Sequence, residues 1–192
     1  MPDLIQLDQS LFSFVNQGLS NPFFDWLMPY LRNRYFWSPL YLFLAIFFVR
    51  NYGKRGWWLL LFFGLTFAVT DYLTSSVVKP AVERLRPCND PDIKTDMNIL
   101  IACGSGYSFP STHAANHFAL AFFLINMFYR RWKLIVPLAI LWAGAISFAQ
   151  VYVGVHYPLD VTFGALLGAM TGYMMAAILK TTQAFRKWKS GN

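Results

Sequence analysis

The chain has 192 residues, of which 56% are hydrophobic and 13% charged, and its formal net charge is +7. This length suits one domain, but the composition departs from that of soluble domains, which are about 25% charged. The basic residues form short clusters between long uncharged stretches. They therefore indicate membrane topology and give no case for nucleic-acid binding.

Residues 1–34 are predicted to form two short amphipathic helices. Apolar and polar patches alternate along this segment, and Asn21-Pro22 divides it into two pieces. Helices of this kind lie in the plane of a membrane interface, here the outer one. The alternative is an additional, weakly hydrophobic span, which would move the N-terminus to the inner side.

The long uncharged stretches predict an all-α integral membrane protein, a bundle of five transmembrane helices, or six if residues 1–34 also cross. A bilayer core of about 30 Å needs roughly 20 apolar residues, and these stretches are apolar nearly all round, unlike soluble helices. The expected spans lie near residues 36–50, 57–78, 113–129, 134–152 and 159–179. We divide the chain into an interfacial segment 1–34, a catalytic transmembrane domain 35–180 with an outer loop 79–110, and a cytoplasmic tail 181–192.

Three basic clusters predict the orientation of the bundle. They are Arg50, Lys54 and Arg55; Arg130, Arg131 and Lys133; and Lys180, Arg186, Lys187 and Lys189. Lys and Arg near span ends are retained on the cytoplasmic side, and five spans put all three clusters on one side. The loop 79–110 and the turn around His156 are then outside, on the periplasmic or exterior face of a bacterial inner membrane.

The first chemically informative cluster contains Lys79, Arg84 and Arg86, followed by Pro87. Three cations within eight residues suit an anion-binding site. Basic flanks that extend to the lipid headgroups are the alternative, but such flanks belong on the cytoplasmic side. We favour anion binding.

The second cluster, Pro110-Ser111-Thr112-His113, directly precedes the third expected span. A helix that begins here directs its free N–H groups and its positive dipole end toward the outer surface, which suits a phosphate. Ser111 and Thr112 add hydroxyl donors. A plain helix cap explains these two residues equally well.

The third cluster is the turn from Tyr152 to Asp160, which contains His156. If the next helix begins near Pro158, the Asp160 carboxylate can contact one imidazole nitrogen, fix the tautomer and raise the basicity of the other nitrogen. A helix-start aspartate favoured by the dipole would explain Asp160 alone. Cations, hydroxyls, a helix N-terminus and two histidines on one surface are the groups needed for phosphoryl transfer without a metal.

These residues resemble the motifs of the type-two phosphatidic acid phosphatase superfamily, K-x6-R-P, P-S-x-H and S-R-x5-H-x3-D. Lys79 with Arg86-Pro87 matches the first, Pro110–His113 the second, and His156 with Asp160 the third. The resemblance implies a membrane lipid phosphatase without a cofactor, in which His156 forms a phosphohistidine, Asp160 orients it and His113 protonates the leaving group. It also implies that Lys79, Arg86 and Ser111 hold the phosphate, and Thr112 is a further candidate.

The chain departs from the third motif at Ala149-Gln150, where the family has Ser-Arg. Gln150 donates hydrogen bonds but carries no charge. We expect Arg84 to supply the missing cation.

Three other features have two interpretations. His117 lies four residues after His113, so the pair could contribute to a zinc site or His117 could pack between helices; we expect no metal. Asp71 lies inside the second expected span and could pair with an active-site cation or bond to a neighbouring helix. Cys88 and Cys103 both lie in the outer loop, where the compartment permits a disulfide, and two free thiols are the alternative.

The sequence therefore predicts a phosphatase whose partners are the bilayer and a membrane lipid phosphate. Undecaprenyl diphosphate is the leading substrate, by resemblance to small bacterial members of the family. Phosphatidylglycerophosphate, phosphatidic acid and lipid A phosphates are alternatives, as is phosphoryl transfer to another lipid. An anion transporter with a basic vestibule is the alternative from a different class.

Overall fold

The computed structural model describes residues 4–186, and every regular element in that range is a helix. Lys187 and Lys189, two residues of the third basic cluster, and the second half of the tail 181–192 lie outside the described residues. The elements are α1 (Leu4–Ser13), η1 (Phe14–Gly18), α2 (Pro22–Leu31), α3 (Ser38–Tyr52), α4 (Lys54–Tyr72), η2 (Leu73–Val78), α5 (Lys79–Val82), η3 (Pro87–Asn89), α6 (Thr112–Phe128), α7 (Ile135–Tyr152), α8 (Pro158–Thr181) and α9 (Gln183–Arg186).

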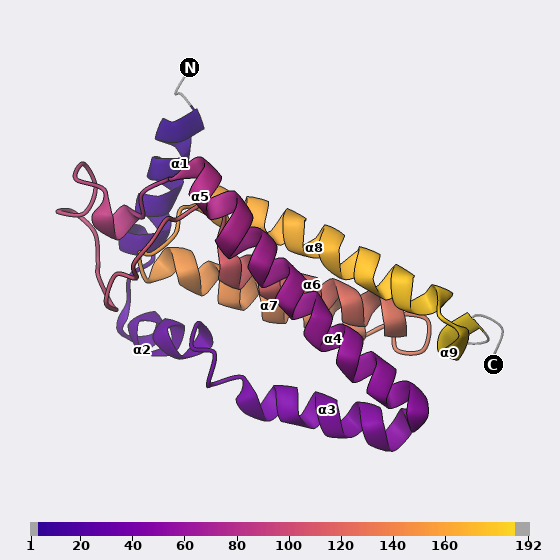
Figure 1. Ribbon diagram of the computed structural model, residues 1–192. Helices are drawn as coiled ribbons and strands as arrows, with labels where there is room; N and C mark the ends of the chain where they lie inside the picture. The colour runs from indigo at the N-terminus through magenta and orange to yellow at the C-terminus, as the bar shows by residue number, and fades with distance from the viewer. Residues whose placement is uncertain (1–3, 187–192) are drawn as a thin grey trace.

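The long helices form an elongated bundle around α6 (Figure 1). Helices α7 and α8 run beside α6, α4 crosses over them, and α3 packs on α4 at the outside. Helix α6 occupies the middle because nearly all of it is apolar, and most of its side chains are buried. One core lies toward the end of the bundle where the C-terminus is, with Phe48, Phe63, Phe123 and Phe128 among its members.

Helices α6 and α8 approach closely because small residues face each other. Gly164, Gly168 and Gly172 repeat every four residues on α8, and a Cβ at Gly168 would lie 2.1 Å from the carbonyl oxygen of Ala115 in α6. Inside a membrane, contact of this kind replaces the hydrophobic effect as the attraction between helices. The packing therefore holds the start of α6 against the start of α8, where His113 and Asp160 lie.

Three helices among the described residues are long and apolar enough to cross a membrane: 54–82, 135–152 and 158–181. The first joins α4, η2 and α5 into one helix of 29 residues. The other two expected spans, near 36–50 and 113–129, correspond to α3 with 15 residues and α6 with 17. Three candidate spans are typical of a multi-pass membrane protein, and five spans stay a prediction.

The N-terminal segment forms two short helices on either side of Asn21-Pro22, as the sequence predicts. Helices α1 and α2 have 10 residues each, so each is about 15 Å long, half of a bilayer core. Phe12 and Met28 enter a second core with Tyr152 and Tyr157 at the ends of α7 and α8. In Figure 1 both helices lie at the end of the bundle opposite α9. Their interfacial location in the membrane stays a prediction.

Much of the segment between α5 and α6 lacks regular structure and is held by cross-links. Cys88 and Cys103 form a disulfide with a Cα–Cα distance of 5.9 Å, which is the pairing that their shared location suggested. Asn16 and Asn98 exchange three hydrogen bonds of 2.8 to 3.0 Å, and Asn16 Nδ2 also donates to the Tyr152 carbonyl at 2.8 Å. These contacts fasten the loop to the N-terminal segment and to the end of α7.

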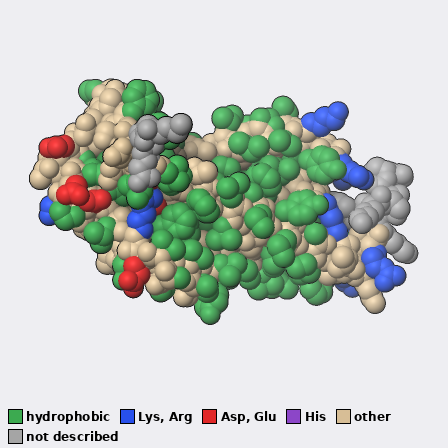
Figure 2. All heavy atoms as spheres, turned by 90° about the horizontal axis from the view of Figure 1, so that it is seen from above, with side chains coloured by type: hydrophobic (Ala, Val, Ile, Leu, Met, Phe, Trp, Pro, Cys, Tyr) green, Lys and Arg blue, Asp and Glu red, His purple; other side chains and the backbone are tan. Residues whose placement is uncertain are grey.

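The surface divides into three zones along the bundle. Figure 2 shows apolar side chains over the middle of the visible face, Lys and Arg at both ends, and Asp and Glu only at the end away from α9. Large apolar residues exposed in the middle include Leu65, Leu138, Leu141, Leu166 and Met170. Such a band matches the hydrocarbon zone of a bilayer.

Candidate active site

His156 lies in the turn between α7 and α8, which the backbone can form because residue 154 is glycine. Gly154 has φ of 86°, and a Cβ there would lie 2.1 Å from the Met97 methyl group. The turn returns the chain sharply and buries the His156 side chain, which is only 3% exposed. Helix α8 then begins at Pro158 and brings Asp160 beneath the imidazole ring.

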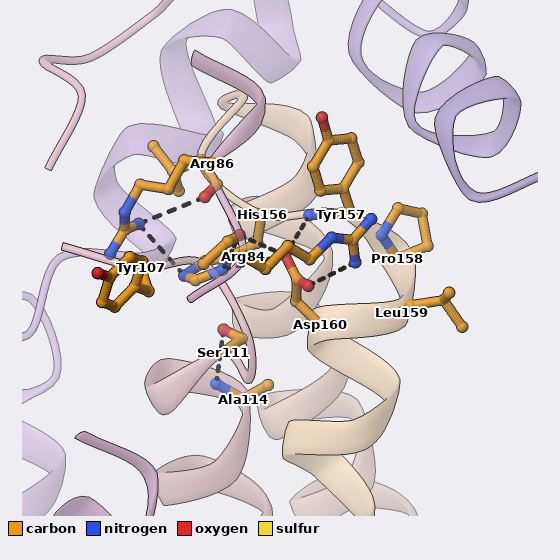
Figure 3. A network of polar contacts seen from close by, with 12 residues as sticks. Arg84, Arg86, Tyr107, Ser111, Ala114, His156, Tyr157, Pro158, Leu159 and Asp160 are labelled. Carbon is orange, nitrogen blue, oxygen red and sulfur yellow. Dashed lines mark hydrogen bonds and ion pairs between the residues drawn. The ribbon is translucent and has the colours of Figure 1, made fainter. Parts of the chain in front are cut away.

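Two groups lie beside Nδ1 of His156. The Asp160 Oδ2 atom is 3.6 Å away, which is too long for a hydrogen bond, and Ser108 Oγ is 3.3 Å away. Ser108 Oγ donates a hydrogen bond to the same Oδ2 atom, and its lone pair can accept a hydrogen bond from Nδ1–H. Ser108 then links the imidazole to the carboxylate. On the other side of the ring, Nε2 is 3.5 Å from Arg86 Nη1 (Figure 3). Nδ1 is therefore the supported nitrogen, and Nε2 is the one that faces the cations.

The environment of His156 keeps its ring neutral at neutral pH. Burial, together with the nearby Arg86 and Lys79 charges, lowers the pKa of His156 to about 4, although the Asp160 carboxylate opposes this shift. A neutral imidazole has a lone pair on one nitrogen, which a nucleophile requires.

Asp160 has fixed partners on both oxygens. Oδ2 accepts from the Tyr157 backbone N–H at 2.8 Å, the reciprocal contact of a helix capping box, as well as from Ser108. Oδ1 accepts from Arg84 Nη1 at 2.7 Å. The carboxylate cannot rotate without breaking several bonds.

Arg84 does not supply the cation that Gln150 lacks, and this corrects the sequence-based expectation. Its guanidinium donates to Asp160 and, at 2.5 Å, to Asp8 of α1, and it stacks 4.1 Å above the Tyr157 ring. Figure 3 shows Arg84 and Arg86 on opposite sides of the His156–Asp160 pair. Two carboxylates hold Arg84 away from the cavity described below, so it supports Asp160 from behind.

Ser111 is also placed differently from the expectation. It is fully buried, and its Oγ accepts from the Ala114 N–H at 3.4 Å as the N-cap of α6. Its own N–H donates to the Asp160 carbonyl at 2.9 Å. The cap interpretation therefore fits Ser111, because its hydroxyl points into its own helix and does not line the cavity.

His156 lines a cavity of about 580 Å³. Six of the predicted site residues line it: Lys79, Arg86, Thr112, His113, Gln150 and His156. Thr112 Oγ1 and both polar atoms of the Gln150 amide are buried and lack hydrogen-bond partners among the described residues. Unpaired buried polar atoms are costly, so these groups suit a polar ligand in the cavity.

The two motif cations are steered by loop carbonyls. Lys79 Nζ donates to the Tyr107 carbonyl at 2.6 Å and the Ser108 carbonyl at 3.3 Å, while Arg86 donates to the carbonyls of Gly106 and Val155. These bonds orient both cationic groups and fasten the loop around residues 106–108 beside the cavity. Burial lowers the pKa of Arg86, but the group keeps its charge because guanidinium pKa values are far above neutrality.

His117 and Asp71 line the cavity with partners of their own. His117 Nδ1 donates to the His113 carbonyl at 2.8 Å, which leaves Nε2 to accept from the Tyr41 hydroxyl at 3.0 Å. Asp71 Oδ1 accepts from the Asn116 amide of α6 at 2.9 Å. These bonds fit the helix-packing interpretation of His117 and the helix-bridging interpretation of Asp71.

Sequence reasoning did not identify Ser108, Arg32 or Arg34. Ser108 is 48 residues from His156 in the chain, and the two arginines belong to the N-terminal segment and also line the cavity. None lies within a motif, so no spacing signal could have identified them. Their proximity arises only from the fold.

Comparisons with known proteins identify a matching family and several similar phosphatases. A family model described as the PAP2 superfamily matches residues 55–184. A lipid A 4'-phosphatase of Bacteroides thetaiotaomicron is 34% identical over 174 residues, which cover 89% of this chain and 76% of that protein. An undecaprenyl-diphosphatase of Sulfolobus acidocaldarius is 31% identical over 182 residues, or 92% of this chain and 81% of that protein. Among solved structures, LpxE of Aquifex aeolicus superposes with a TM-score of 0.71 at 27% identity, covering 89% of this chain and 95% of that one.

Proposed function

The chain belongs to the PAP2 superfamily and is a membrane lipid phosphatase, and from this premise we propose that it removes a phosphate group from lipid A through a phosphohistidine on His156. The observation that carries the proposed chemistry is the pair of environments around the His156 ring. Nδ1 is backed by Ser108 and Asp160, and Nε2 faces Arg86 at the cavity wall. A neutral, oriented imidazole beside fixed cations suits nucleophilic attack on a phosphate.

In the first step the Nε2 lone pair attacks phosphorus while the bond between phosphorus and the lipid oxygen breaks. The positive charge that develops on the imidazole is balanced by Asp160, because the Nδ1 proton is shared toward Ser108 and that carboxylate. Lys79 and Arg86 neutralise the charge on the phosphoryl oxygens, and Thr112 and Gln150 donate to them from the cavity wall.

His113 lines the cavity and is the proposed general acid. It gives a proton to the departing lipid oxygen, then takes one from the water that attacks the phosphohistidine. The second attack breaks the bond between phosphorus and Nε2, releases inorganic phosphate and returns His156 to its neutral form. The cycle needs no redox change and no additional reactant besides water.

Lipid A is proposed first because a protein named lipid A 4'-phosphatase is 34% identical to this chain, whereas the undecaprenyl-diphosphatase is 31% identical, over a similar share of the chain. The relative from Porphyromonas gingivalis with the same name aligns with 91% of the chain. Undecaprenyl diphosphate, the substrate favoured from the sequence, is the second candidate. The similarity to an undecaprenyl-diphosphatase over 92% of the chain supports it.

We further propose that the cavity faces the periplasm or exterior across the inner membrane. The clusters around Arg50, Arg130 and Lys180 lie at or just after the C-terminal ends of α3, α6 and α8, at the end of the bundle opposite His156. The tendency of Lys and Arg to stay in the cytoplasm therefore puts His156 outside.

The proposal is tested by release of inorganic phosphate from purified protein in detergent with excess EDTA. The panel contains lipid A, undecaprenyl diphosphate, phosphatidylglycerophosphate and phosphatidic acid. We expect the highest kcat/KM with lipid A, inhibition by vanadate, and loss of turnover in His156→Asn with normal purification. Activity in His156→Asn, or dependence on added zinc or magnesium, would contradict the mechanism. Phosphate that appears only on a second lipid would indicate a transferase, and no turnover with any lipid would favour a transporter.

A further inference from the structure

Arg32 is a half-buried cavity residue whose Nε atom has no hydrogen-bond partner among the described residues. It immediately follows α2, in the N-terminal segment, and lines the same cavity as Arg86 and His156. Its Nε atom is buried and has no hydrogen-bond partner, and no carboxylate within residues 4–186 forms an ion pair with it. A buried N–H group without a partner is costly, and an anion bound at the guanidinium would satisfy it.

The three cations of the first sequence cluster, Lys79, Arg84 and Arg86, differ from Arg32 in this respect. Lys79 and Arg86 are each tied to loop carbonyls, and Arg84 is held by two carboxylates. Arg32 forms no such hydrogen bond or ion pair among the described residues. Its guanidinium fork can therefore accommodate an anion without giving up a bond in the protein.

Gln150 presents the complementary observation on another wall of the same cavity. Its side chain is completely buried, yet neither Oε1 nor Nε2 has a hydrogen-bond partner. A buried amide that lacks every partner is rare in folded proteins, because water is no longer available to satisfy it. Two unsatisfied side chains from α7 and from the end of α2 thus face one space.

The electrostatics of that space favour an anion with more than one negative charge. Burial lowers the pKa of Arg32, and the charge of Arg86 lowers it further, so the two guanidinium groups are close enough to repel. An anion bound between them converts the repulsion into two attractions. A phosphate has both the charge and the oxygen geometry for two such forks.

The position of Arg32 is prepared before any ligand binds. The Tyr152 hydroxyl donates to Asp25 of α2 at 2.6 Å, and Trp37 Nε1 donates to the Leu31 carbonyl at 2.7 Å. The Trp37 ring also packs edge-on against Trp142 of α7, with centroids 5.9 Å apart. Helix α2 is therefore anchored to α7, the helix that carries Gln150, on both sides of Arg32.

We propose that Arg32 binds the substrate phosphate directly, together with Gln150 and opposite Arg86. The cationic charge that position 150 lacks then comes from the N-terminal segment, which becomes part of the phosphate site. This inference rests on the proposed function, because it identifies a further binding group for the same phosphate. Arg34, which is exposed and also lines the cavity, stands nearer the solvent and is not needed for this contact.

The first test needs no turnover. Thermal unfolding of purified protein in detergent is followed with increasing inorganic phosphate, for the wild type, Arg32→Gln and the control Arg50→Gln, an exposed residue at the other end of α3. A hydrogen bond to a charged group contributes enough that its loss should weaken phosphate binding about 10- to 100-fold in Arg32→Gln. The control should match the wild type. Equal protection of Arg32→Gln and the wild type would overturn the inference, and so would no protection of the wild type.

The second test separates this inference from the proposed function. With any lipid phosphate that the wild type hydrolyses, Arg32→Gln should lower kcat/KM about 10- to 100-fold, and Gln150→Arg should restore part of the loss in the double variant while adding little alone. Arg32→Lys, which keeps the charge but not the fork, should be intermediate and guards against a folding defect. Full activity in Arg32→Gln overturns the inference and leaves the phosphatase intact. Absence of hydrolysis in the wild type, with phosphate protection that depends on Arg32, would refute the function alone.

Discussion

In the folded protein the Ser108 side chain contacts both His156 and Asp160, the two residues that match the third motif. It bonds Asp160 and lies 3.3 Å from Nδ1 of His156, where the direct distance from Nδ1 to the carboxylate is 3.6 Å. We therefore expect Ser108→Ala to lower kcat about 10- to 100-fold with little change in KM, since one buried hydrogen-bonded link is lost. Steady-state kinetics measure both quantities.

Ser10→Ala is the matched control for this prediction. The Ser10 hydroxyl bonds only to the Gln6 carbonyl within α1, and it is exposed. A Ser108→Ala enzyme with the kcat of the control would mean that Asp160 orients His156 without help. A large rise in KM alone would assign Ser108 to substrate binding.

The buried His156 also makes stability depend on pH. The pKa of His156 is about 4 in the folded protein, below the ordinary value of 6.5, so the unfolded chain binds a proton between these values and the folded one does not. Stability therefore falls as pH decreases from 6.5 to 4, by about 3 kcal/mol for this group at the lower end. We expect the midpoint of thermal unfolding to drop less over this range in His156→Gln than in the wild type. Equal drops would mean that the ring is not kept neutral.

At the scale of elements, helix α1 reaches the site through one buried carboxylate. Asp8 is 2% exposed, accepts from the Leu159 N–H at 2.8 Å and pairs with Arg84, which in turn holds Asp160. Asp8→Asn should cost about 3 kcal/mol of stability, because a buried ion pair loses one partner, and should reduce kcat.

The exposed loop residue Asp92 supplies the control Asp92→Asn. Thermal unfolding and phosphate release are measured for Asp8→Asn, Arg84→Gln and the double variant. Strongly non-additive losses are expected, since both residues belong to one network. Additive losses would show that α1 stabilises the fold without acting through Arg84.

The contact between α6 and α8 predicts a second element-scale effect. A methyl group at Gly168 would overlap the Ala115 carbonyl, so Gly168→Ala must push the helices apart and should cost about 1 to 3 kcal/mol. Gly144→Ala in α7 meets no atom within 4 Å and should be neutral or slightly stabilising. The midpoints of thermal unfolding in detergent measure both effects. Equal midpoints for the two variants would contradict the close packing.

At the scale of the whole molecule, the distribution of charge predicts one orientation. A fluorescent protein fused to the C-terminus should fluoresce in cells, because it stays in the cytoplasm, whereas alkaline phosphatase fused there should be inactive. Replacing the three cations of the cluster Arg130, Arg131 and Lys133 with Gln should weaken this preference. An active alkaline phosphatase fusion in the unaltered protein would place the cavity inside the cell.

Several site residues could be predicted because they lie only a few residues apart in the sequence. His156 and Asp160 are four residues apart across a turn and a helix start, and Thr112 and His113 begin the helix that follows Pro110. Spacing along a helix determines which side chains share a face, so these predictions needed no tertiary structure. The helix positions and the apolar band follow similarly from hydropathy.

The roles of Arg84, Ser111 and Arg32 depended on contacts distant in the chain. Arg84 has two carboxylate partners, each 76 residues away in opposite directions, and they draw it from the phosphate to the back of Asp160. Ser111 could cap or bind a ligand until the direction of its hydroxyl was known, and Arg32 meets Arg86 only because α2 docks on α7. Periodicity, apolar length and short motif spacings are local properties, so they predicted a helical membrane protein with phosphatase motifs and identified Lys79 and Arg86 as cavity cations. The position of Arg84 behind Asp160 could come only from the fold, because a long charged side chain goes to whichever opposite charge the packing of distant helices brings within reach.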